Sequence, residues 1–381
     1  MADRILKLKS ISTRGLKNAV KGSEYRKEAA ISYGILIVGY ILLSIGAATG
    51  MIGHNLQGQF VPICVYISLA VSLNLVVGIS GELSLGHAGF MAVGAFSGIL
   101  MERILLVHMS FEPVILIASM LFGAFMAAIA GFIIGIPILG LRGDYLAIVT
   151  LAFGEIIRNF MNVLYFGLDD KGHLKFAFNH TIDGIDNSQR IITGAIGATG
   201  TKTMATFTWG ILLCLFTVFV VLNLKNSKQG RAIMSIRDNR IAAESIGLDV
   251  RKYKLMAFVV SAALAGMAGC LFGLNYSTLV PLKFNFNTSV LILVFVVLGG
   301  VGNIWGGIIA AAVLTILPET FRQFADYRML TYAVVLILVM ICTYNPTIKA
   351  RVDSTWKKIN PFKKRGDGDK PKKKKTGKEA A

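Results

Sequence analysis

The sequence predicts an all-α membrane protein, a bundle of about ten helices that cross the bilayer, and three observations support this prediction. The first is composition: 54% of the 381 residues are hydrophobic, only 16% are charged, and the mean hydropathy is +0.64. Soluble domains carry about 25% charged residues, so most of this surface is not expected to face water. The second is a series of apolar stretches long enough to span a bilayer, and the third is the clustering of basic residues between them.

The candidate spans are ten apolar stretches: 31–52, 60–80, 84–106, 113–138, 144–166, 206–224, 255–276, 288–301, 304–318 and 329–345. The second and third meet in a glycine-rich region, Gly78–Gly98, which is expected to be broken or re-entrant. The eighth and ninth are short and are separated only by the turn Gly299–Asn303. Irregular backbone at membrane depth is tolerated only where it is buried in protein or lines a watery cavity, so these breaks are candidate path positions.

The basic residues predict the orientation. The net charge of +18 gathers in the N-terminal segment 1–30, in the loop 225–254 and in the tail 346–381. Positive residues next to spans mark cytoplasmic loops, so this pattern indicates a membrane protein with both ends in the cytoplasm rather than a nucleic-acid-binding protein. The loop 167–205, whose basic residues are balanced by aspartates, then falls outside. An even number of spans fits this arrangement, and nine spans with a re-entrant segment are the alternative.

Three segments make up the predicted organisation: a basic cytoplasmic segment (1–30), a transmembrane domain (31–345) and a basic tail (346–381). The first thirty residues lack the short apolar core and the cleavage site of a signal peptide, so the first span is expected to stay in the membrane. The lysine-rich tail is expected to be disordered and to touch anionic lipid.

No catalytic chemistry is predicted. The closest approach to a phosphate-binding loop is 194–203, where Thr201 separates Gly200 from Lys202, whereas a P-loop lysine follows its glycine directly. The four cysteines are far apart and the five histidines are scattered, so neither a metal site nor a disulfide framework is implied. The chain is therefore expected to use no cofactor, and energy for transport must come from a partner or an ion gradient.

The loop 225–254 carries the most informative pattern. Four apolar residues are expected to share one helical face: Ile233, Ile236, Ile241 and Ala242. Arg237 and Arg240 would then face water, and the run Ala243-Glu244 belongs to a short helix that stops at Gly247. Such a cytoplasmic helix is suited to docking in a groove of a partner, and the alternative is a solvated helix lying on the lipid headgroups.

Polar residues inside the predicted spans are candidate positions on a translocation path: Asn74, Ser84, His87, Asp144, Glu155 and Arg158. Charges at membrane depth are costly, so they pair with one another or line a path. Glu155 and Arg158 lie one helical turn apart and either neutralise each other or help a zwitterion to pass. His87 is either a hydrogen-bonded packing residue or a substrate or proton site.

Four segments of the chain resemble the LivM-type permease of branched-chain amino acid ABC importers: Leu73–Phe90, Leu141–Arg158, Gly230–Gly269 and Leu298–Gly307. The resemblance covers about residues 60–345. Within it, the pattern Ala-Ala-Glu-x-x-Gly that ends at Gly247 is similar to the ATPase-coupling loop of ABC importer permeases.

This resemblance implies a role in import of leucine, isoleucine and valine across a bacterial cytoplasmic membrane. The implied partners are a homologous second permease, two cytoplasmic ABC ATPases and an extracytoplasmic substrate-binding protein. Glu244 and Gly247 would make the main contact with an ATPase, Ala243 belongs to the same motif, and Arg237 and Arg240 would be supporting charges.

Two alternative functions stay open. The first is an ABC permease for urea or short amides, although the segment 141–158 resembles the amino-acid branch more closely. The second is a secondary transporter driven by protons or sodium, with Glu155 or His87 as the coupling group; such a protein has no need of an ATPase-docking helix. The external loop departs from the family pattern over 169–186, which leaves the substrate range and the docking of a binding protein open.

Overall fold

In a computed structural model, the described residues are Arg26, 28–50, 53–138, 140, 144–168, 174–178, 190–320, Val334 and Ile337. The chain forms two compact units, Met1–Gln323 and Phe324–Ala381, and everything below concerns the first. The basic tail and the tenth predicted span, apart from Val334 and Ile337, lie outside the described residues, as does most of the N-terminal segment.

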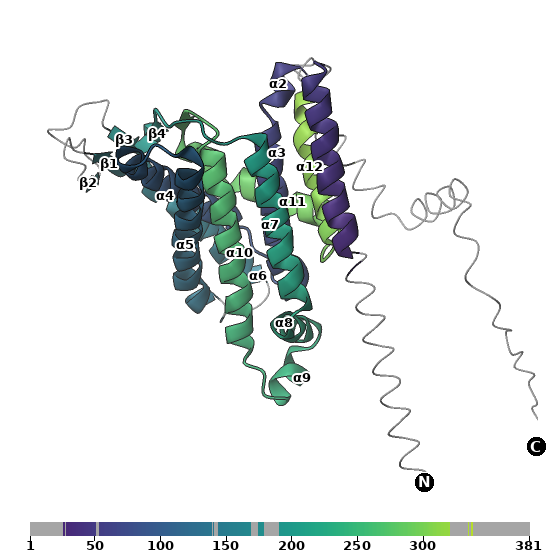
Figure 1. Ribbon diagram of the computed structural model, residues 1–381. Coiled ribbons are helices and arrows are strands. Elements are labelled where there is room, and N and C mark those ends of the chain that lie inside the picture. Colours follow the sequence, from purple (N-terminus) through teal and green to yellow (C-terminus); the bar gives the residue numbers. More distant parts are fainter. Residues whose placement is uncertain are drawn as a thin grey trace, which may run out of the picture. The chain divides into compact units, whose positions relative to one another are not determined.

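Long apolar helices dominate this unit (Figure 1). Six described helices are long and apolar enough to cross a membrane: Glu28–Ala48, Phe60–Ser80, α4 (His87–His108), α5 (Glu112–Ile138), α7 (Phe207–Asn226) and α10 (Val250–Gly273). The second of these begins as α3 (Phe60–Asn74) and continues as the π-helix η1 (Leu75–Ser80). The prediction of a polytopic helical membrane protein is confirmed.

Shorter helices complete the described part of the unit. Two are apolar, α11 (Phe286–Gly299) and α12 (Ile304–Thr320), and α6 (Asp144–Asn162) has one polar face. The remainder are α2 (His54–Gln57), α8 (Lys228–Asp238), α9 (Arg240–Ser245) and the 3-10 helices η3 (Gly194–Ile196) and η4 (Pro281–Phe284). The fifth, eighth and ninth predicted spans therefore exist as helices that are shorter or more polar than the other six.

Small residues let α4, α5 and α10 approach one another closely. A Cβ atom added at Gly94 of α4 would overlap the backbone of Gly266 in α10, and one at Gly266 would come within 2.6 Å of the Gly123 carbonyl oxygen in α5. Packing of this kind holds membrane helices together where lipid offers no hydrophobic drive between them. The helix Phe60–Ser80 runs through the interior, and 94% of the residues in its apolar 18-residue stretch are buried. The helix Glu28–Ala48 is peripheral, and only 11% of the corresponding residues are buried.

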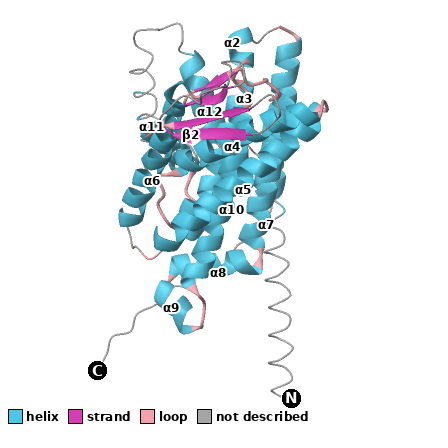
Figure 2. Ribbon diagram, turned by 90° about the vertical axis from the view of Figure 1, so that its left-hand side faces the viewer, coloured by secondary structure: helices cyan, strands magenta, loops and turns pink. Residues whose placement is uncertain are grey.

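The prediction of an all-α fold is wrong at one end of the bundle, where a small antiparallel sheet forms (Figure 2). Its strands are β1 (Leu164–Leu168), β2 (Leu174–Phe178), β3 (Arg190–Thr193), β4 (Ala198–Thr199) and β5 (Thr278–Leu279), in the order β2-β1-β3-β4-β5. The predicted span 144–166 therefore ends as a helix at Asn162. Strand β4 of the loop pairs with β5, more than 70 residues away, and such non-local pairing is not visible in the local sequence.

Arg103 of α4 anchors this sheet to the bundle, because its guanidinium donates hydrogen bonds to the carbonyl oxygens of Thr199 (3.3 Å) and Gly200. We expect Arg103→Met to accelerate amide hydrogen exchange of residues 190–200 about tenfold, since a charge-assisted hydrogen bond contributes about 1.5–3 kcal/mol. The matched control is Lys202→Met, which removes a half-exposed ion pair with Glu112 and is expected to change exchange by less than about twofold. Equal exchange in both variants would show that Arg103 does not hold the sheet.

Candidate functional site

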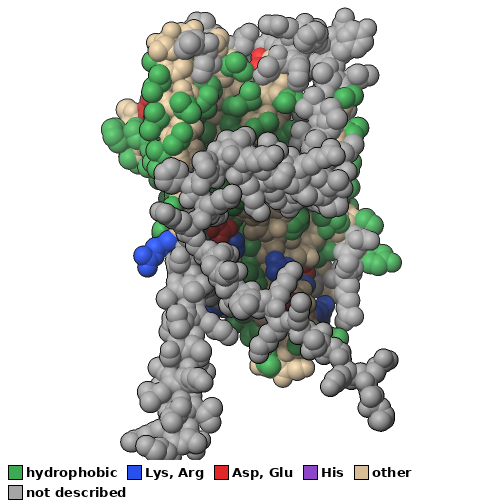
Figure 3. Space-filling view, turned by 90° about the vertical axis from the view of Figure 1, so that its right-hand side faces the viewer, with side chains coloured by type: hydrophobic (Ala, Val, Ile, Leu, Met, Phe, Trp, Pro, Cys, Tyr) green, Lys and Arg blue, Asp and Glu red, His purple; other side chains and the backbone are tan. Residues whose placement is uncertain are grey.

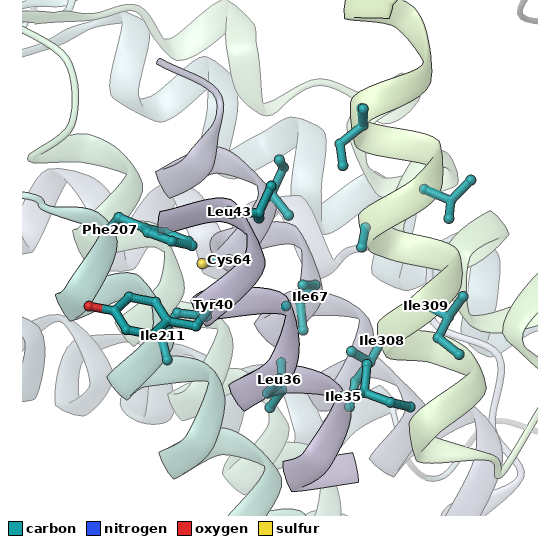
Figure 4. Close-up of a pocket in the computed structure, with 15 residues that line it drawn as sticks. Ile35, Leu36, Tyr40, Leu43, Cys64, Ile67, Phe207, Ile211, Ile308 and Ile309 are labelled. Carbon is teal, nitrogen blue, oxygen red and sulfur yellow. The ribbon is translucent and has the colours of Figure 1, made fainter. Parts of the chain in front are cut away.

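An apolar cavity of about 170 Å³ lies at the edge of the bundle, between the helix Glu28–Ala48 and α3, α7 and α12 (Figure 4). Its walls are aliphatic and aromatic, and the hydroxyl of Tyr40 lies within hydrogen-bond distance of Thr208 Oγ1 at 3.4 Å. An amino acid carries two charges, and buried charges need polar partners. The lining residues of this cavity offer no uncommitted polar group to such charges. We therefore place the candidate site at the polar, glycine-rich segment that follows the helix Phe60–Ser80.

The candidate site lies where the helix Phe60–Ser80 ends in the π-helix η1. After η1 the chain turns at Gly81, whose φ is +76°, and runs without regular structure over 81–86 until α4 begins at His87. Ser84 and Gly86 of this segment are buried, whereas Gly81 and Leu83 are exposed, and the hydroxyls of Ser80 and Ser84 have no hydrogen-bond partner among the described residues. Within the glycine-rich Gly78–Gly98 region, only the residues 81–86 between η1 and α4 lack helical structure. The residues from Phe60 to Ser80 and from His87 to His108 nevertheless form two full-length helices.

Asn74 clamps this broken helix to the turn between α11 and α12. Its Nδ2 atom donates to the carbonyl oxygen of Asn303 (3.0 Å), and its Oδ1 atom accepts from the N–H of Gly302 (2.8 Å). One turn further along, a Cβ atom at Gly78 would overlap both Asn74 Oδ1 and the backbone of Gly302. The two glycine-rich breaks of the sequence therefore meet in space, which spacing alone did not reveal.

We expect Asn74→Ala to lower the free energy of unfolding by about 1–3 kcal/mol, because it leaves a buried N–H and a buried carbonyl without partners. The change is measured as a fall in the thermal unfolding midpoint of the purified protein in detergent. Asn226→Ala is the matched control, since the Asn226 side chain donates to the Leu222 carbonyl of its own helix, at 2.8 Å, and the residue is exposed. Equal midpoints for the two variants would show that the clamp contributes nothing.

His87, at the start of α4, belongs to a buried polar network. Its Nε2 atom lies 2.8 Å from the hydroxyl of Ser72, and the backbone carbonyl of Ser72 accepts from Ser261 Oγ of α10 (2.6 Å). The next N–H, that of Ala88, donates to Ser289 Oγ of α11 (3.1 Å). This network ties α3, α4, α10 and α11 together, and it gives His87 a buried hydrogen-bond partner.

The charged residues of α6 lie apart from this centre. Arg158 donates to Glu155 at 2.7 Å, and the other oxygen of Glu155 accepts the N–H of Phe286, the first residue of α11, at 3.1 Å. The pair is therefore mutually neutralised and also joins α6 to α11. Asp144 is the first residue of α6, and its side chain lies outside the described residues. Thr150, which sequence reasoning missed, bonds the N–H of Leu85 at 3.0 Å and so links α6 to the broken segment.

The loop 225–254 folds into two short helices, α8 and α9, at the end of the bundle opposite the sheet (Figures 1 and 2). Side chains cap each start: Ser227 accepts from the N–H of Gly230, and Asn239 accepts from the N–H of Ala242, both at 3.0 Å. We refer to residues 225–254 as the coupling segment.

The prediction of a single apolar face on the coupling segment is wrong, because the cap at Asn239 breaks the helix. Ile233 and Ile236 of α8 are buried as expected, but Ile241 is 78% exposed and Ala242 is exposed too. Ala243 is the buried residue of α9, and it packs with Ile236 and Val250 in a small apolar cluster. Its side chain therefore faces inward rather than toward a partner.

The predicted stop of the helix is confirmed at Gly247. This residue has φ +83°, its N–H donates to the Glu244 carbonyl (3.0 Å), and a Cβ atom there would meet nothing within 4 Å. The turn leaves Ile246 75% exposed. In the same helix, Nε of Arg240 and Oε1 of Glu244 form a half-exposed ion pair at 2.9 Å. The tip of the coupling segment thus presents apolar and charged groups together, outward from the bundle.

Two contacts of the coupling segment could not be identified from sequence spacing. Arg237 donates from Nη1 to the carbonyl oxygen of Gly78 in η1 (2.7 Å), and Lys254 forms an ion pair with Glu82. Arg237 was expected to face water, and its guanidinium instead reaches the broken helix. A faint sequence signal for the second contact exists, since Glu82 and Lys254 are opposite charges that flank predicted spans.

Eight basic residues of the described part lie in the coupling segment, at one end of the unit. On the face that Figure 3 presents, the Lys and Arg side chains of the described residues lie in the lower half, the end that carries α8 and α9. The fold, the polar broken centre and the basic end together define a polytopic helical membrane protein with a structured loop at its basic end.

Comparison with known proteins identifies its family. The family described as the permease component of branched-chain amino acid transport systems matches residues 58–344. This match covers most of the chain and includes the broken centre and the coupling segment. The chain therefore belongs to this permease family.

The similar proteins carry matching names. The chain is 36% identical over 289 residues to the high-affinity branched-chain amino acid transport system permease protein LivM of Escherichia coli (strain K12), covering 73% of this chain and 66% of the relative. It is 35% identical over 288 residues to LivM of Salmonella typhimurium, with the same two coverages, so the chain spans slightly less than two thirds of either relative. Identity to the permease protein LivH of Salmonella typhimurium is 22% over 283 residues, or 72% of this chain and 88% of the relative. No solved structure matches the chain.

Proposed function

We propose that the chain is the transmembrane permease subunit of an ATP-driven importer for branched-chain amino acids, and that it performs no catalysis itself. The observation that carries the proposal is the family match over residues 58–344. The names of the LivM relatives support branched-chain amino acids as the substrate class. ATP hydrolysis belongs to partner subunits, since the sequence has no P-loop.

The proposed assembly contains a second permease, two cytoplasmic ATPases and an extracytoplasmic binding protein. The chain is similar both to LivM and to LivH, which supports pairing between two homologous permeases. The exposed tip of the coupling segment, with Ile241, Ile246 and the Arg240–Glu244 pair, has the mixed apolar and charged character of an interface. We assign this tip to an ATPase and the sheet at the opposite end to the binding protein.

In the proposed topology, α6, α11, α12 and the stretch 329–345 cross the membrane together with the six long helices, which gives ten spans with both ends in the cytoplasm of a bacterial inner membrane. The basic end of the unit supports this orientation. Asn74, Ser84 and His87 then lie on or beside the path, whereas Glu155 and Arg158 hold α6 against α11.

The proposal is tested by uptake of labelled leucine into proteoliposomes that contain the purified complex and trapped ATP. Uptake is expected to require both ATP and the binding protein and to be competed by isoleucine and valine. Uptake sustained by a proton or sodium gradient without ATP would establish a secondary transporter instead. Competition by urea or acetamide, but not by isoleucine, would favour the amide permease.

A further inference from the structure

The guanidinium of Arg237 bridges two parts of the protein. Its Nε and Nη2 atoms donate to the neighbouring carboxylate of Asp238, at 3.1 and 2.9 Å, while Nη1 donates to the carbonyl oxygen of Gly78 at 2.7 Å. The arginine fork is thus fixed on one side by its own helix and bound on the other to η1. Hydrogen bonds with an ionised donor are shorter and stronger than neutral ones, so this is a firm connection.

The backbone of η1 is shaped to receive this side chain. The last carbonyl groups of a helix lack intrahelical partners and carry partial negative charge, which suits a cation at Gly78. Gly81 follows in the left-handed region, and a Cβ atom there would overlap Cγ of Arg237. The glycine therefore serves both the turn and the passage of the arginine stem. Single-turn π-helical segments inside helices are rare and are frequent at functional sites.

A second connection reaches the same place from the other end of the coupling segment. Lys254, in the first turns of α10, forms an ion pair with Glu82, and both side chains are largely buried, at 15% and 10% exposure. Two residues of the coupling segment therefore bind the segment 78–82: Arg237, which precedes α9, and Lys254, which follows it. The exposed residues of α9 remain available to a partner.

The opposite side of η1 is held by a different element. Asn74 binds the turn between α11 and α12 through Gly302 and Asn303, as described above. A displacement of the coupling segment would pull on Gly78 and Glu82 and pass through Asn74 to this turn. These are contiguous hydrogen bonds, ion pairs and close backbone contacts rather than a path inferred from distance alone.

We infer that Arg237 is a positioning residue that transmits movement of the coupling segment to the π-helical turn Leu75–Ser80, rather than a contact for an ATPase. The inference rests on the proposed function. It assigns the broken end of the helix Phe60–Ser80 as the part of the path that ATP binding moves, with Gly78 as the point at which the force arrives.

The test uses the complete transporter in proteoliposomes and measures leucine uptake and ATP hydrolysis in the same vesicles. Arg237→Met keeps the aliphatic stem and removes the donors. We expect it to lower leucine transported per ATP hydrolysed about tenfold, the equivalent of one charge-assisted hydrogen bond, while hydrolysis changes less than about twofold. Arg237→Lys, which keeps the charge without the fork, should fall between the two. Arg231→Met is the matched control: Arg231 lies on the same helix, is exposed, and donates to the carbonyl of Asn226 at 2.8 Å.

A second readout follows the π-helical turn itself. Amide hydrogen exchange of residues 75–86 is expected to change on ATP binding in the wild-type complex and in Arg231→Met, and to become insensitive to ATP in Arg237→Met. An ATP response in Arg237→Met equal to that of wild type would overturn the inference, as would loss of ATPase co-purification, which would make Arg237 a docking contact. If Arg237→Met does not accumulate, Arg237→Lys carries both measurements. A wild-type complex that responds to ATP in this segment but takes up no leucine would refute the proposed substrate and leave the transmission intact.

Discussion

Gly247→Val is expected to abolish leucine uptake while the permease still assembles with its partners. Gly247 occupies the left-handed region at φ +83°, where a side-chain-bearing residue costs about 1–2 kcal/mol and a β-branched one more. Its turn ends α9 and sets the angle of the exposed tip, so a distorted turn misplaces Ile246 and Glu244 together. Because a Cβ atom at this position meets nothing within 4 Å, the variant should fold and insert normally. Uptake and co-purification of the ATPase from the same membranes measure the two effects separately.

The control for this variant is Gly247→Asn, which adds a side chain of similar size that tolerates left-handed backbone. If conformation is what matters, the asparagine variant should keep at least about half of the wild-type uptake, because its backbone cost is a few tenths of a kcal/mol to about 1 kcal/mol. Unchanged uptake in Gly247→Val would count against the role of the coupling segment. Equal loss in both variants would instead mean that the tip tolerates no added bulk.

Gly78→Ala is the second variant with a large expected effect. The added Cβ atom would overlap Asn74 Oδ1 and the backbone of Gly302, and neither neighbour is a flexible side-chain end that can move away cheaply. Overpacking of a close contact costs about 1–3 kcal/mol, so we expect a clear fall in the thermal unfolding midpoint and loss of most uptake.

The same substitution at Gly34 separates this effect from helix propensity. Gly34 lies in the peripheral helix Glu28–Ala48, and a Cβ atom there meets nothing within 4 Å. Gly34→Ala should leave the midpoint unchanged or raise it slightly, since alanine favours a helix over glycine by about 1 kcal/mol. If Gly78→Ala behaves like Gly34→Ala, the helix end at Gly78 is not as tightly enclosed as the structure describes.

Much of the fold follows from hydropathy and charge. Every predicted span that lies within the described residues corresponds to a helix, since apolar stretches at this depth must satisfy their backbone internally. The sheet could not be predicted in the same way. Phe166 was predicted at the end of a span and Ile192 in a loop, and nothing in the local sequence shows that these two residues pair across β1 and β3.

The candidate site was predicted in composition but not in arrangement. The sequence indicates polar residues beside glycine-rich breaks, and the stop at Gly247 follows from the lack of a side chain there. It does not indicate that Asn74 meets Gly302, more than 220 residues away, or that Arg237 turns back into the bundle. Long-range contacts of this kind depend on how the helices pack, which periodicity within one helix does not encode.

The error on the face of the coupling segment has a local cause. Spacing placed Ile241 with Ile233 and Ile236 on one continuous helix, whereas the side chain of Asn239 caps a new helix at this point. A single asparagine in a charged run is easily missed as a cap, because Asn is common in loops for several reasons. As a result, Ile241 is exposed at the tip of the coupling segment instead of buried beside Ile233 and Ile236.

The measurement that most directly tests the account places a photo-crosslinking amino acid at Ile246 in the complete transporter. Ile246 is 75% exposed at the tip of the coupling segment, and Ile196, 63% exposed in η3 beside the sheet, is the matched position at the opposite end. We predict a crosslink from position 246 to an ATPase subunit and none from position 196 to an ATPase. An ATPase crosslink from position 196, or its absence at 246 in a complex that hydrolyses ATP, would contradict the assignment of this segment as the site where the ATPase drives the permease.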